Sequence, residues 1–139
     1  MAAAETQRRS QADRRDEAER RLLDAATALV ARNGLERVTL ADVGEAAGYS
    51  RGLPAHYFGS KSGLIVRLAD HLVEVFLENL ALFEQHPRGL ERVLGIVRFY
   101  LDSAAKSPVQ TRALYVLLGE GLSNKLIAPQ LAELTARSV

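Results

Sequence analysis

The 139-residue chain is long enough for one domain with a hydrophobic core, and its aromatic content is only 6%. The absence of cysteine excludes disulfides, a thiol nucleophile and a thiolate zinc site, and we expect a reducing, cytoplasmic setting. A formal net charge of +1 neither indicates nor excludes nucleic-acid binding. The start of the chain lacks the apolar region of a secretory signal, and no apolar run approaches the ~18 residues of a membrane span. We therefore expect no membrane partner.

The N-terminal segment, residues 1–12, is small, polar or charged, and we expect a disordered arm. Its arginine pairs Arg8–Arg9 and Arg14–Arg15 have two interpretations: a solvated tail, or contacts with a phosphate backbone or minor groove. A first helix is predicted from Asp13 to Arg32 because apolar residues recur there at helical spacing. This stripe consists of Leu22, Ala25, Ala26, Leu29 and Val30.

The stretch TLADVGEAAGYSRGLPAHYF, residues 39–58, predicts two short helices joined by a tight turn. Thr39 is a good N-cap for the first helix, and Asp42 has the spacing of a capping box. Gly48 suits the left-handed backbone that ends a helix. Ser50 can cap a second helix that runs to Phe58 and is roughly 12 Å long at ~1.5 Å per residue. Together these elements predict a helix-turn-helix.

Two residues in this stretch bear on how the short helices pack. Gly44 lies inside the first helix, where it costs up to ~1 kcal/mol relative to alanine. It either permits a close approach of the second helix or is a tolerated glycine on an exposed face. Pro54 costs a helical hydrogen bond if the second helix begins at Arg51. If the helix begins later, Pro54 lies in the first turn, where backbone N–H groups have no helical partner and the missing N–H costs nothing. We expect a short, irregular second helix.

The remainder of the chain predicts a long helix and a helical body. Ser60 caps a helix that runs to about Gln85, whose wide apolar stripe requires several neighbours. Further helices are expected over 90–103, from Pro108 with Ser107 as its cap to about Leu122, and from Pro129 to Val139. The predicted fold class is all-α, with a helix-turn-helix head over 13–76 and a helical regulatory and dimerisation region over 77–139.

The segments LADVGEAAGYSRG and HYFGSKSGL resemble the DNA-binding end of the TetR family of transcriptional regulators, over about Glu17 to Phe76. The resemblance implies a dimeric repressor whose second short helix enters the DNA major groove. The family usually has tyrosine at the position of Ala55, so a backbone contact is missing here that Tyr57 can replace. The chain stops where the family usually continues with two long dimerisation helices. We expect either a truncated body or dimerisation through the surfaces of the earlier helices.

The residues expected to contact DNA lie in the second short helix and beside it. Arg51 can bind guanine or a phosphate, His56 can read a base edge, and Ala55 can touch a thymine methyl. Lys61, in the first turn of the long helix, matches a phosphate-binding lysine of the family, and the free N–H groups there also favour phosphate. The alternative for Lys61 is one more exposed lysine. The complete set is Thr39, Ser50, Arg51, Gly52, Pro54, Ala55, His56, Tyr57 and Lys61.

A small-molecule pocket is expected between the long helix and the two helices that follow. Its walls would be Phe76, Phe99, Tyr100 and Tyr115, although aromatics at helical spacing also suit a plain core. The three histidines do not have metal-ligand spacing, and nucleotide-binding and hydrolase motifs are absent, so we expect no enzyme activity, metal or cofactor.

The predicted function is a sequence-specific regulator, a repressor that a small-molecule effector releases from its double-stranded operator. Two subunits of a homodimer would read the half-sites of a palindrome. The alternative is a helical protein-interaction module, related to the same family, that has lost specific DNA recognition. Steep loss of DNA affinity with rising salt would distinguish the regulator from the module.

Overall fold

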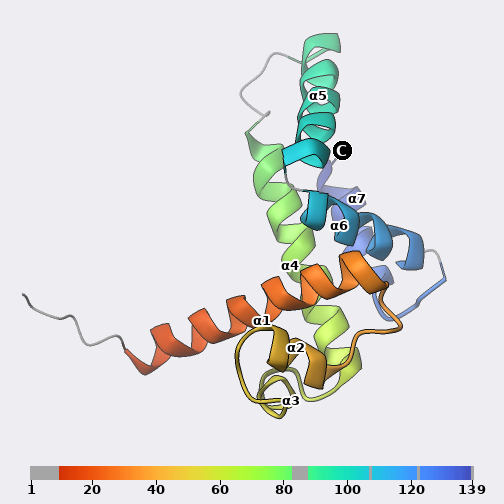
Figure 1. Ribbon diagram of the computed structural model, residues 1–139. Helices are drawn as coiled ribbons and strands as arrows, with labels where there is room; N and C mark the ends of the chain where they lie inside the picture. Colours follow the sequence, from red (N-terminus) through yellow and green to blue (C-terminus); the bar gives the residue numbers. More distant parts are fainter. Residues whose placement is uncertain (1–9, 83–87, 107, 122, 139) are drawn as a thin grey trace, which may run out of the picture.

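The computed structural model describes residues 10–82, 88–106, 108–121 and 123–138, and within these ranges the regular structure is entirely helical. This confirms the predicted all-α fold class. The helices, shown in Figure 1, are α1 (Gln11–Asn33), α2 (Leu40–Ala46), α3 (Leu53–Phe58), α4 (Lys61–Ala81), α5 (Leu90–Lys106), α6 (Pro108–Gly121) and α7 (Ala128–Ser138).

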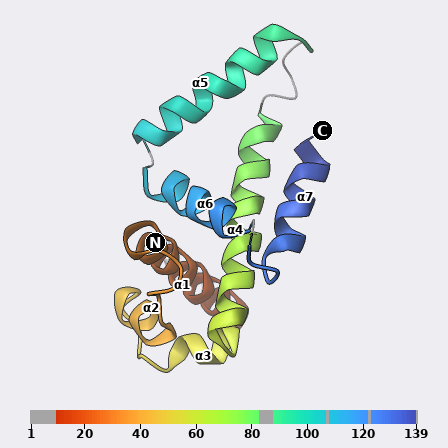
Figure 2. The same ribbon diagram turned by 90° about the vertical axis from the view of Figure 1, so that its right-hand side faces the viewer.

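The helices form a head and a body that α4 connects. Helices α1, α2 and α3 make the head, and α4 rises from it, as Figures 1 and 2 show. Helices α6 and α7 lie on either side of α4, and α6 also packs against α1. Helix α5 lies at the end of the molecule far from α3 and packs mainly on α6. The head therefore touches the body through α6 as well as through α4.

The core runs without a break from the head into the body. The predicted stripe of α1 supplies three fully buried residues, Leu22, Ala26 and Val30, and Val43 joins them from α2. The loop between α1 and α2 adds Leu35 and Val38 to the same cluster. Helices α4 and α6 and the segment before α7 complete it with Leu64, Leu68, Leu72, Ala113, Leu114, Leu117 and Ile127. Head and body therefore share one core, in which α6 packs directly against α1.

Helix α1 begins earlier than predicted. The Ser10 side chain accepts from the Asp13 N–H at 3.1 Å, and the Asp13 carboxylate accepts from the Ser10 N–H at 2.9 Å. This reciprocal capping box satisfies donors at the helix start and places residues 11 and 12 in the helix. The prediction of a disordered arm is therefore wrong for residues 10–12. The rest of the arm, including Arg8–Arg9, lies outside the described residues.

Several other helix ends lie at or near the positions that the sequence pattern predicts. Ser60 caps α4, and its side chain accepts from the Gly63 N–H at 3.1 Å. The predicted end of this helix and the predicted cap Ser107 lie outside the described residues. Helix α5 extends three residues beyond the predicted Ser103, and α7 starts one residue before Pro129.

Candidate nucleic-acid interface and pocket

The first short helix ends in a turn that its glycine makes possible. Gly48 has a φ of 78°, and its N–H donates to the Glu45 carbonyl at 3.1 Å. The Tyr49 N–H donates to the Gly44 carbonyl at 2.9 Å, and this pair of bonds is a Schellman motif. At the other end, the Thr39 hydroxyl accepts from the Asp42 N–H and donates to its carboxylate at 2.6 Å. The predicted caps at both ends of α2 are present.

The two short helices cross at Gly44. This glycine is buried, and a Cβ atom placed on it would overlap the Ser50 carbonyl oxygen and lie 3.0 Å from Cδ of Pro54. The close-approach interpretation of Gly44 is confirmed, and the exposed-glycine alternative is wrong. Pro54 is itself among the side chains that are less than 2% exposed. Its ring therefore fills the contact between α2 and α3, and a DNA contact by Pro54 stays a prediction.

Helix α3 starts later than predicted. It begins at Leu53 with Gly52 as its N-cap, and no side chain caps it. The predicted capping role of Ser50 is wrong; its carbonyl instead accepts from the Leu53 N–H at 3.2 Å in the turn before the helix. Pro54 is then the second helical residue, where no N–H is needed. The six-residue helix is about 9 Å long at ~1.5 Å per residue, shorter than expected.

The exposed part of the interface surrounds α3. Thr39, Ser50, Arg51, Gly52, Ala55 and His56 are exposed, whereas Tyr57 and Lys61 are half-buried. Arg51 forms a 2.8 Å ion pair with Glu45, and both side chains are about two-thirds exposed, at 66% and 68%. An exposed pair of this kind contributes only about 0–1 kcal/mol, so Arg51 can exchange it for a phosphate or a base at little cost.

Lys61 is not simply one more exposed lysine. It is the first residue of α4, and its Nζ donates to the backbone carbonyl of Glu36 in the loop between α1 and α2. The lysine therefore joins this loop to the start of α4. Its ammonium also lies at the N-terminal end of α4, whose free N–H groups favour an anion.

A groove that the sequence did not reveal joins α1 to α3. It has a volume of about 680 Å³, and the polar side chains along it are those of Gln11, Arg14, Arg15, His56 and Tyr57. Part of the groove is formed by the first residues of α1, which the prediction left out of the helix. The spacing of Ser10 and Asp13 would have indicated this earlier helix start. The groove places the Arg14–Arg15 pair beside α3, so these arginines belong to the candidate interface.

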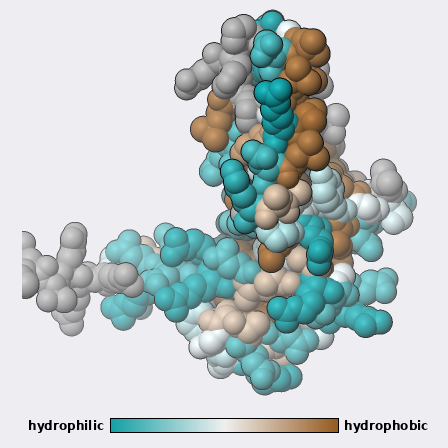
Figure 3. Space-filling view, turned by 45° about the horizontal axis from the view of Figure 1, so that its top comes forward, coloured by the Kyte–Doolittle hydropathy of each residue, from teal (hydrophilic) through white to brown (hydrophobic). Residues whose placement is uncertain are grey.

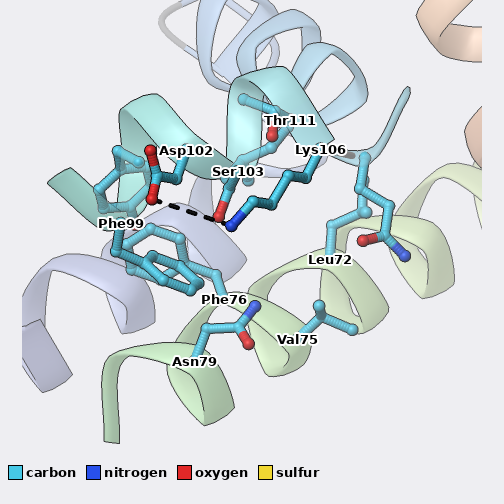
Figure 4. Close-up of a pocket in the computed structure, with 12 residues that line it drawn as sticks. Leu72, Val75, Phe76, Asn79, Phe99, Asp102, Ser103, Lys106 and Thr111 are labelled. Carbon is cyan, nitrogen blue, oxygen red and sulfur yellow. Dashed lines mark ion pairs between the residues drawn. The ribbon is translucent and has the colours of Figure 1, made fainter. Parts of the chain in front are cut away.

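A second cavity, of about 380 Å³, lies between α4, α5 and α6 (Figure 4). Three of the four predicted aromatics, Phe76, Phe99 and Tyr100, line it, with the rings of Phe76 and Tyr100 5.4 Å apart. Tyr115 lies outside the cavity and is 56% exposed. The remaining lining is Leu72, Val75, Asn79, Asp102, Ser103, Lys106, Gln110, Thr111 and Leu114.

The cavity combines an apolar wall with a polar edge. Burial, and then the charge of Tyr115, raises the pKa of Tyr100 from 10.0 to about 12, so its phenol keeps its proton at a higher pH than an ordinary tyrosine does. Asp102 and Lys106 form an ion pair at 3.9 Å on one side of the cavity (Figure 4). This arrangement suits a molecule with an apolar body and a polar group that accepts or donates hydrogen bonds.

Residues 22–68 match the family model of bacterial regulatory proteins of the tetR family. This segment contains the helix-turn-helix, the Gly44–Pro54 crossing and Lys61. Over these residues the chain is similar to the TetR family of regulators.

Two sets of relatives extend the comparison. The chain is 34% identical over 86 residues to the HTH-type transcriptional regulator BetI of Brucella canis, covering 61% of this chain and 43% of BetI. BetI of Paraburkholderia phymatum is 38% identical over 52 residues, which is 37% of this chain and 26% of that protein. The chain thus matches less than half the length of these TetR-family relatives.

The crystal structure of NalD, the secondary repressor of the MexAB-OprM multidrug efflux pump in Pseudomonas aeruginosa, has the same fold. The TM-score is 0.50 at 17% identity, over 89% of this chain and 62% of NalD. Among the described residues, no helix has the length and apolarity to cross a membrane. The same part of the chain has no cluster of three or more histidine or acidic side chains that could hold a metal.

Proposed function

We propose that this chain is a sequence-specific DNA-binding transcriptional regulator of the TetR family, a repressor that a small-molecule effector releases from its operator. The observation that carries the proposal is the exposed end of α3. The buried contact of Gly44 with Pro54 holds α3 against α2, which leaves Arg51, Ala55 and His56 exposed side by side. A rigidly held short helix with exposed polar side chains suits base reading in a major groove.

The position of each polar side chain indicates whether it would contact bases or phosphates. Arg51 and His56 lie on the exposed face of the recognition region, where base edges would meet them. Lys61 and the groove arginines, Arg14 and Arg15, lie on either side of α3 and suit the phosphate backbone. A homodimer would present two such heads to the half-sites of a palindromic operator.

The cavity between α4, α5 and α6 is the proposed effector site. Leu114 lines this cavity and belongs to the core cluster that also contains Leu22 and Ala26 of α1. A ligand that moves α6 therefore acts on α1 through packed side chains, in parallel with α4, which runs from the cavity to the head. Effector binding would favour a head position that no longer matches the operator.

The first test is fluorescence anisotropy with the DNA that flanks this protein's own gene, compared with a scrambled duplex at two salt concentrations. We expect tighter binding to the native fragment and a steep loss of affinity with salt. Arg51→Ala or His56→Ala should weaken binding and relax base preference, whereas Lys61→Ala should weaken binding to both duplexes alike. The control is Arg112→Ala, which removes an exposed arginine on α6 and should change neither the DNA affinity nor the base preference.

Two results would contradict these proposals. Equal, weak binding to both duplexes at low salt would favour the interaction module over the regulator. The proposed effector site is contradicted if a compound that releases DNA from the wild type is equally effective on Phe99→Ala, which alters the cavity wall. Tyr115→Ala is its control, because Tyr115 lies outside the cavity.

A further inference from the structure

The first turns of α1 project from the head without a hydrophobic core of their own. Residues 11–16 are all exposed, and the first buried side chain of this helix is that of Ala18. Figure 1 shows this end of α1 extending beyond α2 and α3, and Figure 3 shows hydrophilic side chains covering it. One wall of the groove, which carries Arg14 and Arg15, therefore lies on a segment in which no described side chain is buried.

A polar contact joins α1 to α4 at the point where the buried part of α1 begins. Glu19 follows Ala18 directly, and its Oε1 accepts a hydrogen bond from Nε of Arg67 at 2.7 Å. The side chains of Arg67 and Glu19 are only 38% and 29% exposed, compared with 66% and 68% for the Arg51–Glu45 pair. Water therefore screens the bond between α1 and α4 less than the pair beside α3. Because its partners are 48 positions apart, this bond fixes one helix against another.

The guanidinium of Arg67 is also restrained from within its own helix. Its Nη1 lies 4.0 Å from Oε2 of Glu74, two turns further along α4. Carboxylates at two edges of a planar guanidinium restrict its orientation. Leu64 and Leu68, the α4 residues on either side of Arg67, belong to the core cluster that α4 shares with α1. Arg67 is therefore a well-fixed attachment point for Glu19.

The bond between Glu19 and Arg67 connects the two walls of the groove. On the α1 wall, Arg15 precedes Glu19 by four residues, which places the two side chains on one face of the helix, one turn apart. The other wall, α3, continues through Gly59 and Ser60 into α4, which carries Arg67. The groove therefore lies between two helical segments that are joined to each other one turn beyond Arg15. Without that bond, the start of α1 is free to move relative to α3.

We propose that Arg67 is a positioning residue for the candidate nucleic-acid interface. Through Glu19 it holds the start of α1 against α4, and so it sets the width of the groove between α1 and α3. Arg67 does not line the groove, and it acts on DNA only through Arg14 and Arg15, which do. The effect on DNA binding rests on the proposed function, whereas the effect on the width of the groove does not.

The width of the groove is measured first, on the full chain without DNA. Because the natural chain contains no cysteine, Ala12→Cys and Ala55→Cys place one spin label on each wall, both at exposed positions. Electron paramagnetic resonance should give a narrow distribution of distances between the labels, and Arg67→Gln should broaden or shift it. Glu19→Gln should have the same effect, and the variant with both glutamines should show no additional change. A distribution that Arg67→Gln leaves unchanged would overturn the proposal.

Two further variants separate the bond from a general loss of charge or stability. Arg21→Gln is the matched control, because Arg21 is exposed and pairs at 3.0 Å with Glu17 inside α1, so the distances should not change. Exchanging the charges, Glu19→Arg with Arg67→Glu, should narrow the distribution again. The exchange is made together with Glu74→Gln, which removes a carboxylate that would repel the new one. Equal broadening by Arg21→Gln, or no recovery in the exchanged protein, would contradict a role for this bond.

DNA binding is measured next, with the same native and scrambled duplexes. Arg67→Gln should weaken binding to both by roughly threefold to tenfold, and it should reduce the slope of log affinity against log salt by about one to two, because phosphate contacts of Arg14 and Arg15 are lost. A protein that was only less stable would bind less but keep the same slope. With Arg14→Ala and Arg15→Ala already present, Arg67→Gln should cause no additional loss, and a further loss would contradict the proposal.

The two proposals can fail separately. If the wild type binds neither duplex, the proposed function fails, and the distances between the labels still decide whether Arg67 sets the width of the groove. If the wild type prefers the native duplex and Arg67→Gln changes neither the distances nor the salt slope, the positioning role is overturned and the proposed function stands.

Discussion

Replacing Gly44 with alanine tests whether the α2–α3 crossing determines the geometry of the head. The added Cβ would overlap the Ser50 carbonyl oxygen and lie 3.0 and 3.2 Å from Cδ and Cγ of Pro54. Alanine is intrinsically better than glycine in a helix by up to ~1 kcal/mol. Overpacking a tight contact costs about 1–3 kcal/mol, and here the nearest obstacle is backbone. We expect a net loss of about 1–2 kcal/mol in the free energy of unfolding.

The chain offers a matched control in Gly119→Ala. Gly119 lies in α6 and is exposed, and a Cβ atom added to it would meet no other atom within 4 Å. This substitution should therefore stabilise the protein by up to ~1 kcal/mol through helix propensity alone. Urea denaturation of both variants, followed by circular dichroism, gives the comparison. The two free energies of unfolding should differ by about 1–3 kcal/mol, with opposite signs relative to the wild type.

Two further measurements separate the contributions at the crossing. Pro54→Ala in the Gly44→Ala background removes the ring contacts but leaves the Ser50 carbonyl, so it should recover only part of the lost stability. The Gly44→Ala protein that remains folded should bind operator DNA more weakly, because α3 is displaced from α2. If Gly44→Ala stabilises the protein as Gly119→Ala does, the close crossing is not a constraint and our reasoning is refuted.

Three other predictions address single side chains. Thr39→Ala should lower the free energy of unfolding by about 1 kcal/mol through loss of the α2 cap, and an unchanged urea midpoint would contradict it. The folded protein should lose stability as the pH rises from 10.0 towards 12, because the Tyr100 phenol ionises at a lower pH in the unfolded chain than in the folded one. The urea midpoint of Tyr100→Phe should not show this contribution to the pH dependence. Glu45→Gln should raise operator affinity by up to about threefold in anisotropy titrations, because it releases Arg51 from its ion pair; a lower affinity would count against Arg51 as a DNA contact.

Helix positions were largely predictable because their signals are local. The N-caps Thr39 and Ser60, the turn glycine Gly48 and the apolar stripe of α1 each act within a few residues of chain, and the structure has all of them. The start of α1 was equally local, since Ser10 and Asp13 form a capping box. The grouping of Phe76, Phe99 and Tyr100 around one cavity followed from the expected packing of α4 against the next two helices.

Long-range contacts decided the remaining features. Pro54 decides whether Ser50 or Gly52 is the N-cap of α3, because its ring is buried against Gly44, ten residues earlier. Capping preferences act locally and do not include that contact. The bond from Lys61 to the Glu36 carbonyl joins residues 25 positions apart.

The sequence by itself determined the helical class and the helix-turn-helix and carried the resemblance to the TetR family, because periodicity, caps and turn residues lie within short segments. The tertiary structure alone decided that α6 packs on α1 and that Arg14 and Arg15 share a groove with His56. It also decided that, within the described residues, Leu90, Leu94, Val97 and Leu101 of α5 are exposed. The physical reason is that an apolar stripe specifies burial without specifying its partner. The partner of each apolar helix face is determined only when all the helices pack together around one core.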